Sequence, residues 1–313
     1  MMDAASRSLV ERAAAQLKRR NETPVAQPIT VNGDWSNAAD PVQQPRAQSS
    51  QQRATAPPKA APAPQPASNP HSRHVNIDRD ALLRHGIALP SAGRSRVVEE
   101  FRIVKRKVVA KFLDEVDANP EAARNRAIMV TSAKPGEGKT FTAINLALTI
   151  ASEQDLKVLL IDLDTRRHAM QEMMGIPASR GLTDLLSNPD VDFPDVMLRT
   201  NMPNLAVIPA GHPDNRAPEL LSSKRTREMF EEMTQRYSDR FIIFDAPSCL
   251  ANSDPVTLAS IVGQLIFVVE ADQTQQEEIE AGIALVSACP NISLLLNKVR
   301  ASATDRFGSY SNY

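Results

Sequence analysis

The sequence predicts an α/β fold, a doubly wound and mostly parallel sheet with helices on both faces, over residues 76–300. Six apolar segments of strand length follow one another in this region, and segments of helical length separate them. Strands that are apolar along their whole length are typical of parallel sheets buried on both faces. Polar motifs follow several of these strands directly, at the sheet edge where such folds bind ligands. One large domain with a ligand site at that edge is therefore expected.

A short amphipathic helix is predicted for residues 1–20. Leu9, Val10 and Leu17 recur at helical spacing, and most of the arginine and lysine side chains lie on the opposite side. The pattern is compatible with docking on a partner or a membrane surface, and equally with a solvated helix that binds nothing.

Residues 21–75 are predicted to form a disordered linker. Ten prolines lie between Pro24 and Pro70, in a stretch rich in alanine, glutamine and serine that contains Trp35 as its one aromatic residue. Such a segment buries too little apolar surface to offset the conformational entropy lost on ordering.

The domain itself is predicted to begin with a helix over residues 96–116, because apolar side chains recur there at helical spacing. These side chains belong to Val97, Phe101, Val104, Val108 and Phe112. The strands that follow are predicted at residues 127–131, 158–162, 205–209, 241–245, 265–270 and 292–296.

A phosphate-binding loop is predicted at Ala133–Thr140, directly after the first of these strands. Its spacing is that of a P-loop in which alanine replaces the first glycine. Glycines let backbone N–H groups turn toward phosphates, and the N-terminus of the following helix adds a favourable dipole. Lys139 is expected to reach the β- and γ-phosphates and Thr140 to bind Mg²⁺. A glycine-rich turn that binds nothing is the alternative.

Lys134 precedes Lys139 by five residues. This spacing resembles the deviant Walker A loop of the partitioning ATPases, in which the first lysine reaches a nucleotide across a dimer. A surface lysine without that role explains the residue equally well.

Three aspartates stand at the ends of two other strands. Asp162 and Asp164 are two residues apart, so on an extended chain they are expected to project to the same side, toward the phosphates. Asp245 follows four apolar residues, the form of a Walker B strand, and is expected to bind Mg²⁺ through water. Together with the loop they predict a Mg-ATP site of a P-loop NTPase.

With these motifs in order, residues 94–300 resemble the bacterial tyrosine kinases (BY-kinases), in particular exopolysaccharide-associated autokinases whose membrane activator is a separate chain. The Asp-x-Asp-x-Arg element ends at Arg166. It is followed by Ile208-Pro209-Ala210-Gly211 and by Ala217-Pro218-Glu219-Leu220-Leu221-Ser222, which are similar to the family's Pro-Ala-Gly and Pro-x-Glu-Leu-Leu segments. Glu99, Arg102 and Lys105 resemble the family's Glu-x-x-Arg-x-x-Arg oligomerisation motif, with lysine in the last position.

The resemblance implies a set of roles. Lys139, Asp162 and Asp164 are expected to be catalytic, with Asp162 assisting the tyrosine hydroxyl, and Thr140, Asp164 and Asp245 to hold Mg²⁺. Contacts with ATP are expected from Lys134, Gly136, Glu137, Gly138, Lys139, Thr140, Phe141, Arg166 and Asn297. Asn297 and Lys298 end the last strand, where related proteins contact the base, and Arg300 stands where a guanine-specific site requires aspartate, so adenine is favoured.

Residues 301–313 are predicted to form a flexible tail that carries the phosphoacceptors. The family implies a C-terminal tyrosine cluster phosphorylated by a neighbouring subunit. Tyr310 and Tyr313 are two of the chain's three tyrosines and lie in its last four residues. An ordinary mobile terminus is the alternative. The third, Tyr237, is expected to pack in the fold.

Composition narrows the partners. The net charge of −1 gives no reason to expect nucleic acid, and two cysteines are too few for a disulfide framework. No apolar run approaches the ~20 residues of a membrane span. A cytoplasmic protein is expected, recruited to the inner face of the plasma membrane through a partner. The resemblance implies that this partner is a polysaccharide co-polymerase, or chain-length protein, and that the protein forms a homo-oligomer, a ring or a dimer.

Three functions remain open from the sequence. The first is an ATP-dependent protein-tyrosine autokinase that regulates exopolysaccharide synthesis or export. The second is a partitioning or positioning ATPase without kinase activity, which Lys134 favours and the tail tyrosines do not. The third is a nucleotide-gated adaptor for a membrane export partner, with little turnover.

Overall fold

The computed structural model describes residues 73–90, 93, 95–116 and 126–299. The helix predicted for residues 1–20, most of the predicted linker and the predicted tail at residues 301–313, with Tyr310 and Tyr313, lie outside the described residues.

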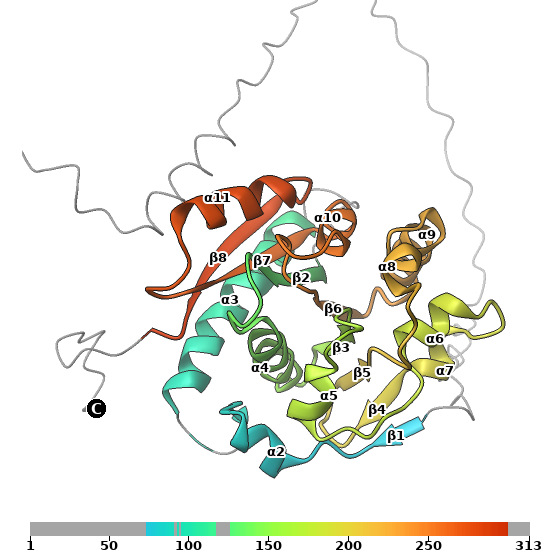
Figure 1. Cartoon of the computed structure of the whole chain (residues 1–313). Helices are drawn as coiled ribbons and strands as arrows, with labels where there is room; N and C mark the ends of the chain where they lie inside the picture. Colours follow the sequence, from blue (N-terminus) through green and yellow to red (C-terminus); the bar gives the residue numbers. More distant parts are fainter. Residues whose placement is uncertain (1–72, 91–92, 94, 117–125, 300–313) are drawn as a thin grey trace, which may run out of the picture.

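The described residues form one eight-stranded sheet in the order β1-β4-β5-β3-β6-β2-β7-β8 (Figure 1). The strands are β1 (Arg73–Val75), β2 (Ala127–Ser132), β3 (Lys157–Asp162), β4 (Leu198–Thr200), β5 (Leu205–Ile208), β6 (Arg240–Asp245), β7 (Gln264–Glu270) and β8 (Asn291–Asn297). Neighbouring strands are parallel except β4 and β5, which are antiparallel. The predicted mostly parallel sheet is therefore confirmed.

Helices cover both faces of the sheet, as predicted (Figure 1). One face packs against α2 (Arg79–Arg84), α3 (Arg96–Val116), α4 (Lys139–Ala151) and α5 (Ala169–Met174). The other packs against α6 (Leu182–Ser187), α7 (Phe193–Val196), α8 (Ala217–Leu221), α9 (Lys224–Arg236), α10 (Asp254–Leu258) and α11 (Gln276–Leu285). Two apolar cores, one on each face, result. No helix among the described residues is long and apolar enough to cross a membrane.

The helix α3 has the predicted bounds and buries the predicted stripe. Phe101 meets the ring of Phe141 edge-on at a centroid distance of 6.0 Å, and Phe112 meets Phe241 in the same way at 5.4 Å. The first contact joins α3 to α4, the helix that follows the predicted phosphate-binding loop, and the second joins α3 to β6.

The six predicted strands are all present, and each of their ends lies within one residue of the prediction. Two short strands were not predicted, β1 at the edge of the sheet and β4 beside it. The predicted linker is therefore wrong at its C-terminal end, since residues 73–75 form β1 and pair with β4. A strand of three residues is too short for an apolar period to be recognised, and β1 is placed by its pairing with β4 and by the packing of Val75.

Candidate active site

The loop between β2 and α4 has the backbone shape that a phosphate-binding loop requires. Gly136 and Gly138 have φ angles of 93° and 96°, in the left-handed region that favours glycine. Gly138 also caps the N-terminus of α4. A Cβ atom at this position would lie 2.0 Å from Nδ2 of Asn297, so a side chain there would have to displace that of Asn297 as well as strain the backbone.

Glu137 braces this loop from within. Its side chain is 1% exposed, and its Oε2 accepts a hydrogen bond from the backbone N–H of Lys134 at 2.7 Å. Its Oε1 accepts one from the hydroxyl of Thr274, and its backbone carbonyl accepts one from Nδ2 of Asn297 at 2.9 Å. The carboxylate is thus occupied by contacts within the protein, and the predicted nucleotide contact of Glu137, for which its backbone N–H is left, stays a prediction.

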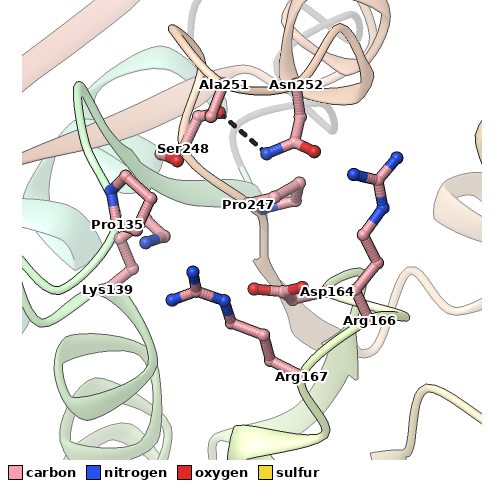
Figure 2. A pocket seen from close by; sticks show the side chains of 9 residues that line it. All are labelled: Pro135, Lys139, Asp164, Arg166, Arg167, Pro247, Ser248, Ala251 and Asn252. Carbon is pink, nitrogen blue, oxygen red and sulfur yellow. Dashed lines mark hydrogen bonds between the residues drawn. The ribbon is translucent and has the colours of Figure 1, made fainter.

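Lys139 begins α4 and lines a cavity of about 150 Å³ at the carboxyl edge of the sheet (Figure 2). Its side chain is 7% exposed. Burial lowers the pKa of Lys139, and the nearby carboxylates of Asp245 and Asp164 act in the opposite direction. The other lining residues are Pro135, Asp164, Arg166, Arg167, Pro247, Ser248, Ala251 and Asn252.

Asp162 and Asp245 are neighbours on adjacent strands, since the register of β3 and β6 pairs these two residues. Both are 1% exposed. Burial raises the pKa of both carboxyl groups, that of Asp245 to about 7, although the Thr140 hydroxyl and Lys139 lower it. Oδ2 of Asp162 and both oxygens of Asp245 are buried without a hydrogen-bond partner of good geometry in the described residues. A buried negative charge is costly unless hydrogen bonds or an opposite charge compensate it. A bound cation would compensate the charge on these oxygens.

These residues fit Mg²⁺. The described part of the chain contains no group of three or more histidine, cysteine, aspartate or glutamate side chains arranged to hold a metal by itself. Mg²⁺ is instead typically held by one or two carboxylates, water and substrate phosphates. Asp245, the adjacent Thr140 hydroxyl and Asp164 at the cavity wall offer such an incomplete set.

Asp162 and Asp164 differ in exposure, and their predicted common projection toward the phosphates stays a prediction. Asp164 lines the cavity, whereas Asp162 is buried beneath it and its Oδ1 accepts a hydrogen bond from the backbone N–H of Asp164 at 3.0 Å. Ile161 and Leu163, which alternate with the two aspartates, pack in the same apolar core, although β3 itself ends at Asp162.

Lys134 turns toward α11 instead of the cavity. Its Nζ lies 2.7 Å from Oε2 of Glu278, and this hydrogen-bonded ion pair raises the pKa of Lys134. A contact with a nucleotide in a second subunit would require the pair to separate. The cross-dimer role stays a prediction.

Two other predicted nucleotide contacts are occupied within the fold. The side chain of Phe141 packs on Phe101 of α3. As for Glu137, only backbone atoms of Phe141 are left for the predicted contact with the nucleotide, which stays a prediction. Asn297 donates to the loop at Glu137, and its contact with a base stays a prediction.

The three residues predicted to take part in oligomerisation lie on α3. Glu99 and Arg102 form an ion pair with each other, with side chains about half exposed, and Lys105 pairs with Glu153 beyond the end of α4. Tyr237 packs as expected, edge-on to Phe193 at 6.4 Å.

The sequence analysis missed most of the cavity wall. Arg167 follows the predicted Arg166 directly and lines the same cavity, and Ser248 and Asn252 come from the loop after β6. The sequence offered one signal for these residues, since they lie next to Arg166 or shortly after the Walker B strand. The turns after the strands set the direction of their side chains, and the sequence pattern does not show it.

Comparison with known proteins identifies the family. Residues 125–289 match the AAA domain family. The chain is 31% identical over 221 residues to the tyrosine-protein kinase CpsD of Streptococcus agalactiae, an alignment that covers 69% of this chain and 94% of CpsD. The chain belongs to the bacterial tyrosine-protein kinases.

Other members of this tyrosine-protein kinase family differ from the chain in extent. The tyrosine-protein kinase ptk of Acinetobacter johnsonii is 33% identical over 159 residues, but the alignment spans 51% of this chain and 21% of ptk. The kinase domain of the Escherichia coli tyrosine kinase ETK superposes with a TM-score of 0.53 at 28% identity, covering 61% of this chain and 74% of that domain. The residues that match the AAA domain family, 125–289, include the predicted phosphate-binding loop.

Proposed function

We propose that the protein is an ATP-dependent protein-tyrosine autokinase that transfers the γ-phosphoryl group of ATP to Tyr310 and Tyr313 of a neighbouring copy. The observation that carries this proposal is the cavity in which Lys139 meets Asp164, above the buried pair Asp162 and Asp245. Lys139 would bind the phosphates, and the loop backbone around Gly136 and Gly138 would enclose them. Mg²⁺, held by Thr140, Asp245 and Asp164, would neutralise charge on the triphosphate.

Asp164 is the carboxylate best situated to accept the proton of the tyrosine hydroxyl, because it lines the cavity. The sequence analysis assigned this role to Asp162. Asp162 is buried and holds the backbone of Asp164 in place, which suits a supporting role beside the cation. Asp164→Asn is accordingly expected to remove transfer to tyrosine while nucleotide binding persists.

The kinase is further proposed to act as a homo-oligomer in exopolysaccharide synthesis or export, activated by a separate membrane chain-length protein that recruits it to the inner face of the plasma membrane. Its family resemblance supports this, as does the exposed pair Glu99 and Arg102 on α3. An exposed ion pair contributes only about 0–1 kcal/mol, so its partners can exchange for those of a neighbouring subunit at little cost.

Phosphotyrosine formation tests the proposal. The purified protein is incubated with Mg-ATP and probed for phosphotyrosine, beside Lys139→Met and a double Tyr310→Phe, Tyr313→Phe variant. Signal is expected in the intact protein alone. No signal in the intact protein, with or without a candidate activator, would overturn the kinase proposal and favour the partitioning ATPase if ATP is hydrolysed. Signal kept by the double variant would overturn only the choice of acceptors.

A further inference from the structure

Arg167 lies on the turn that follows β3 and points into the cavity, toward Lys139 (Figure 2). Its backbone N–H donates to the carbonyl oxygen of Asp164 at 3.3 Å, which closes a turn between the two residues. The next residue, His168, has a φ of 49°, unusual for a residue other than glycine, so the chain bends sharply directly after Arg167. Asp164 and Arg167 are therefore presented to the cavity by one short, closed turn.

The two consecutive arginines face different surroundings. Arg166 extends toward Asn252 and α10 (Figure 2), where its charge acts on the buried carboxyl of Asp254. The side chain of Arg167 has no ion-pair or hydrogen-bond partner among residues 73–299 where the structure describes them. Burial is the main cause of the lowered pKa of Lys139, and the positive charge of Arg167 lowers it further. Lys139, Arg166 and Arg167 thus all line one cavity, with Arg167 the arginine that points toward Lys139, and such a concentration of positive charge suits a multiply charged anion.

Phosphoryl transfer needs positive charge where negative charge develops. The bond between the γ-phosphorus and the β–γ bridging oxygen breaks, its electron pair leaves with ADP, the tyrosine oxygen bonds to phosphorus, and the tyrosine proton passes to Asp164. Charge then spreads over three equatorial oxygens, and a cation fixed beside them accelerates the step. Lys134 is the other lysine of the loop, but it is paired with Glu278 on α11.

We propose that Arg167 is a catalytic residue of the kinase, a guanidinium supplied by the same chain that binds the transferred phosphoryl group more tightly in the transition state than in bound ATP. This proposal rests on the proposed phosphoryl transfer. It assigns to Arg167 a planar, always charged donor group, which suits three equatorial oxygens better than a lysine does.

The experiment compares the affinity for Mg-ADP with and without aluminium fluoride, which imitates the transferred group, by calorimetric titration. The intact protein, Arg167→Ala, Arg167→Lys and the exposed α9 control Arg227→Ala are measured. In the intact protein and the control, aluminium fluoride should tighten ADP binding. Arg167→Ala should lose at least about ten-fold of that tightening and about 100-fold in the rate of phosphotyrosine formation, while its affinity for ADP alone changes less than about three-fold. Arg167→Lys should recover part of both.

The outcomes separate this inference from the proposed function. Full tightening in Arg167→Ala, or an equal loss of affinity for ADP alone, would overturn the role of Arg167, and so would an intact protein that aluminium fluoride does not affect. ADP binding by Arg167→Ala shows that the variant is folded. Arg167-dependent tightening in a protein that makes no phosphotyrosine would leave the role of Arg167 standing, in ATP hydrolysis, and would overturn the tyrosine kinase.

Discussion

At the scale of single residues, the contact between Gly138 and Asn297 joins the phosphate-binding loop to the end of β8. A Cβ atom at Gly138 would lie 2.0 Å from Nδ2 of Asn297, whereas one at Gly136 would have no neighbour within 4 Å, although both glycines have similar positive φ angles. An alanine would therefore strain the backbone at both positions, but only at position 138 would its Cβ atom also clash with Asn297. This makes each the control for the other.

Gly138→Ala is expected to lower the free energy of unfolding by about 1–3 kcal/mol more than Gly136→Ala, because only the first displaces Asn297. Urea unfolding of the nucleotide-free variants measures the difference. Adding Asn297→Ala to Gly138→Ala should recover most of the excess. Equal losses at the two glycines would show that strain alone, and not the contact with Asn297, requires glycine at position 138.

The buried carboxyl of Asp245 makes stability depend on pH. Burial raises its pKa from 3.8 to about 7, so in this range the folded protein binds a proton that the unfolded chain releases. This contribution to stability is complete below about pH 4 and is lost as pH rises through about 7. Asp245→Asn is uncharged at every pH and should remove that part of the pH dependence.

Urea unfolding at pH 5 and pH 8, with a chelator present, measures the effect. Between pH 5 and pH 8 the free energy of unfolding should fall more in the intact protein than in Asp245→Asn. The difference should be on the order of 1.4 kcal/mol for each pH unit that lies below the raised pKa of Asp245. Carboxylates whose pKa is lowered in the fold contribute to the pH dependence of both proteins, so the comparison cancels their effect. One of them is Asp239, whose pKa is lowered to about 2 by Arg240. Identical pH slopes would contradict the raised pKa.

At the scale of elements, the sequence predicts the strands and helices that have a clear apolar pattern. It misses features that depend only on strand pairing or on tertiary contacts. The six apolar strands were predicted to within one residue because burial on both faces gives a continuous apolar segment. The strands β1 and β4 were missed because three residues carry no usable period. Phe141 was assigned to the nucleotide through the family resemblance, yet its ring packs on Phe101 of α3, 40 residues earlier in the sequence.

The helix α3 is held mainly by its apolar stripe, with Phe112 as an anchor. Phe112 is 8% exposed, meets Phe241 edge-on and carries the guanidinium of Arg126 4.5 Å above its ring centroid. Phe112→Ala should lower the free energy of unfolding by about 3–5 kcal/mol, the range for deleting a buried aromatic ring. Chemical unfolding tests this against Arg106→Ala, an exposed substitution on the same helix expected to change stability by less than about 0.5 kcal/mol. Similar small losses in both would mean that α3 is only loosely packed.

At the scale of the whole molecule, the catalytic cavity and the proposed acceptors belong to different parts of the chain. Asn297 touches the phosphate-binding loop of its own subunit, and the tail begins a few residues later. A chain of 14 residues (300–313) spans at most about 50 Å when extended, so length alone allows Tyr310 and Tyr313 to approach either their own cavity or a neighbour's. Geometry therefore leaves the direction of transfer to experiment.

Mixing two variants decides it. The first, Lys139→Met, keeps its tyrosines but lacks the lysine proposed to bind phosphate. The second, Tyr310→Phe with Tyr313→Phe, keeps its cavity but lacks the proposed acceptors. We expect phosphotyrosine on the Lys139→Met chain, distinguished by a size tag, only when both are present with Mg-ATP. Because transfer between subunits needs an encounter, the initial rate per molecule of intact protein should fall on dilution below the concentration at which it assembles. An unlabelled Lys139→Met chain, together with a rate per molecule that dilution does not change, would mean that each chain phosphorylates its own tail.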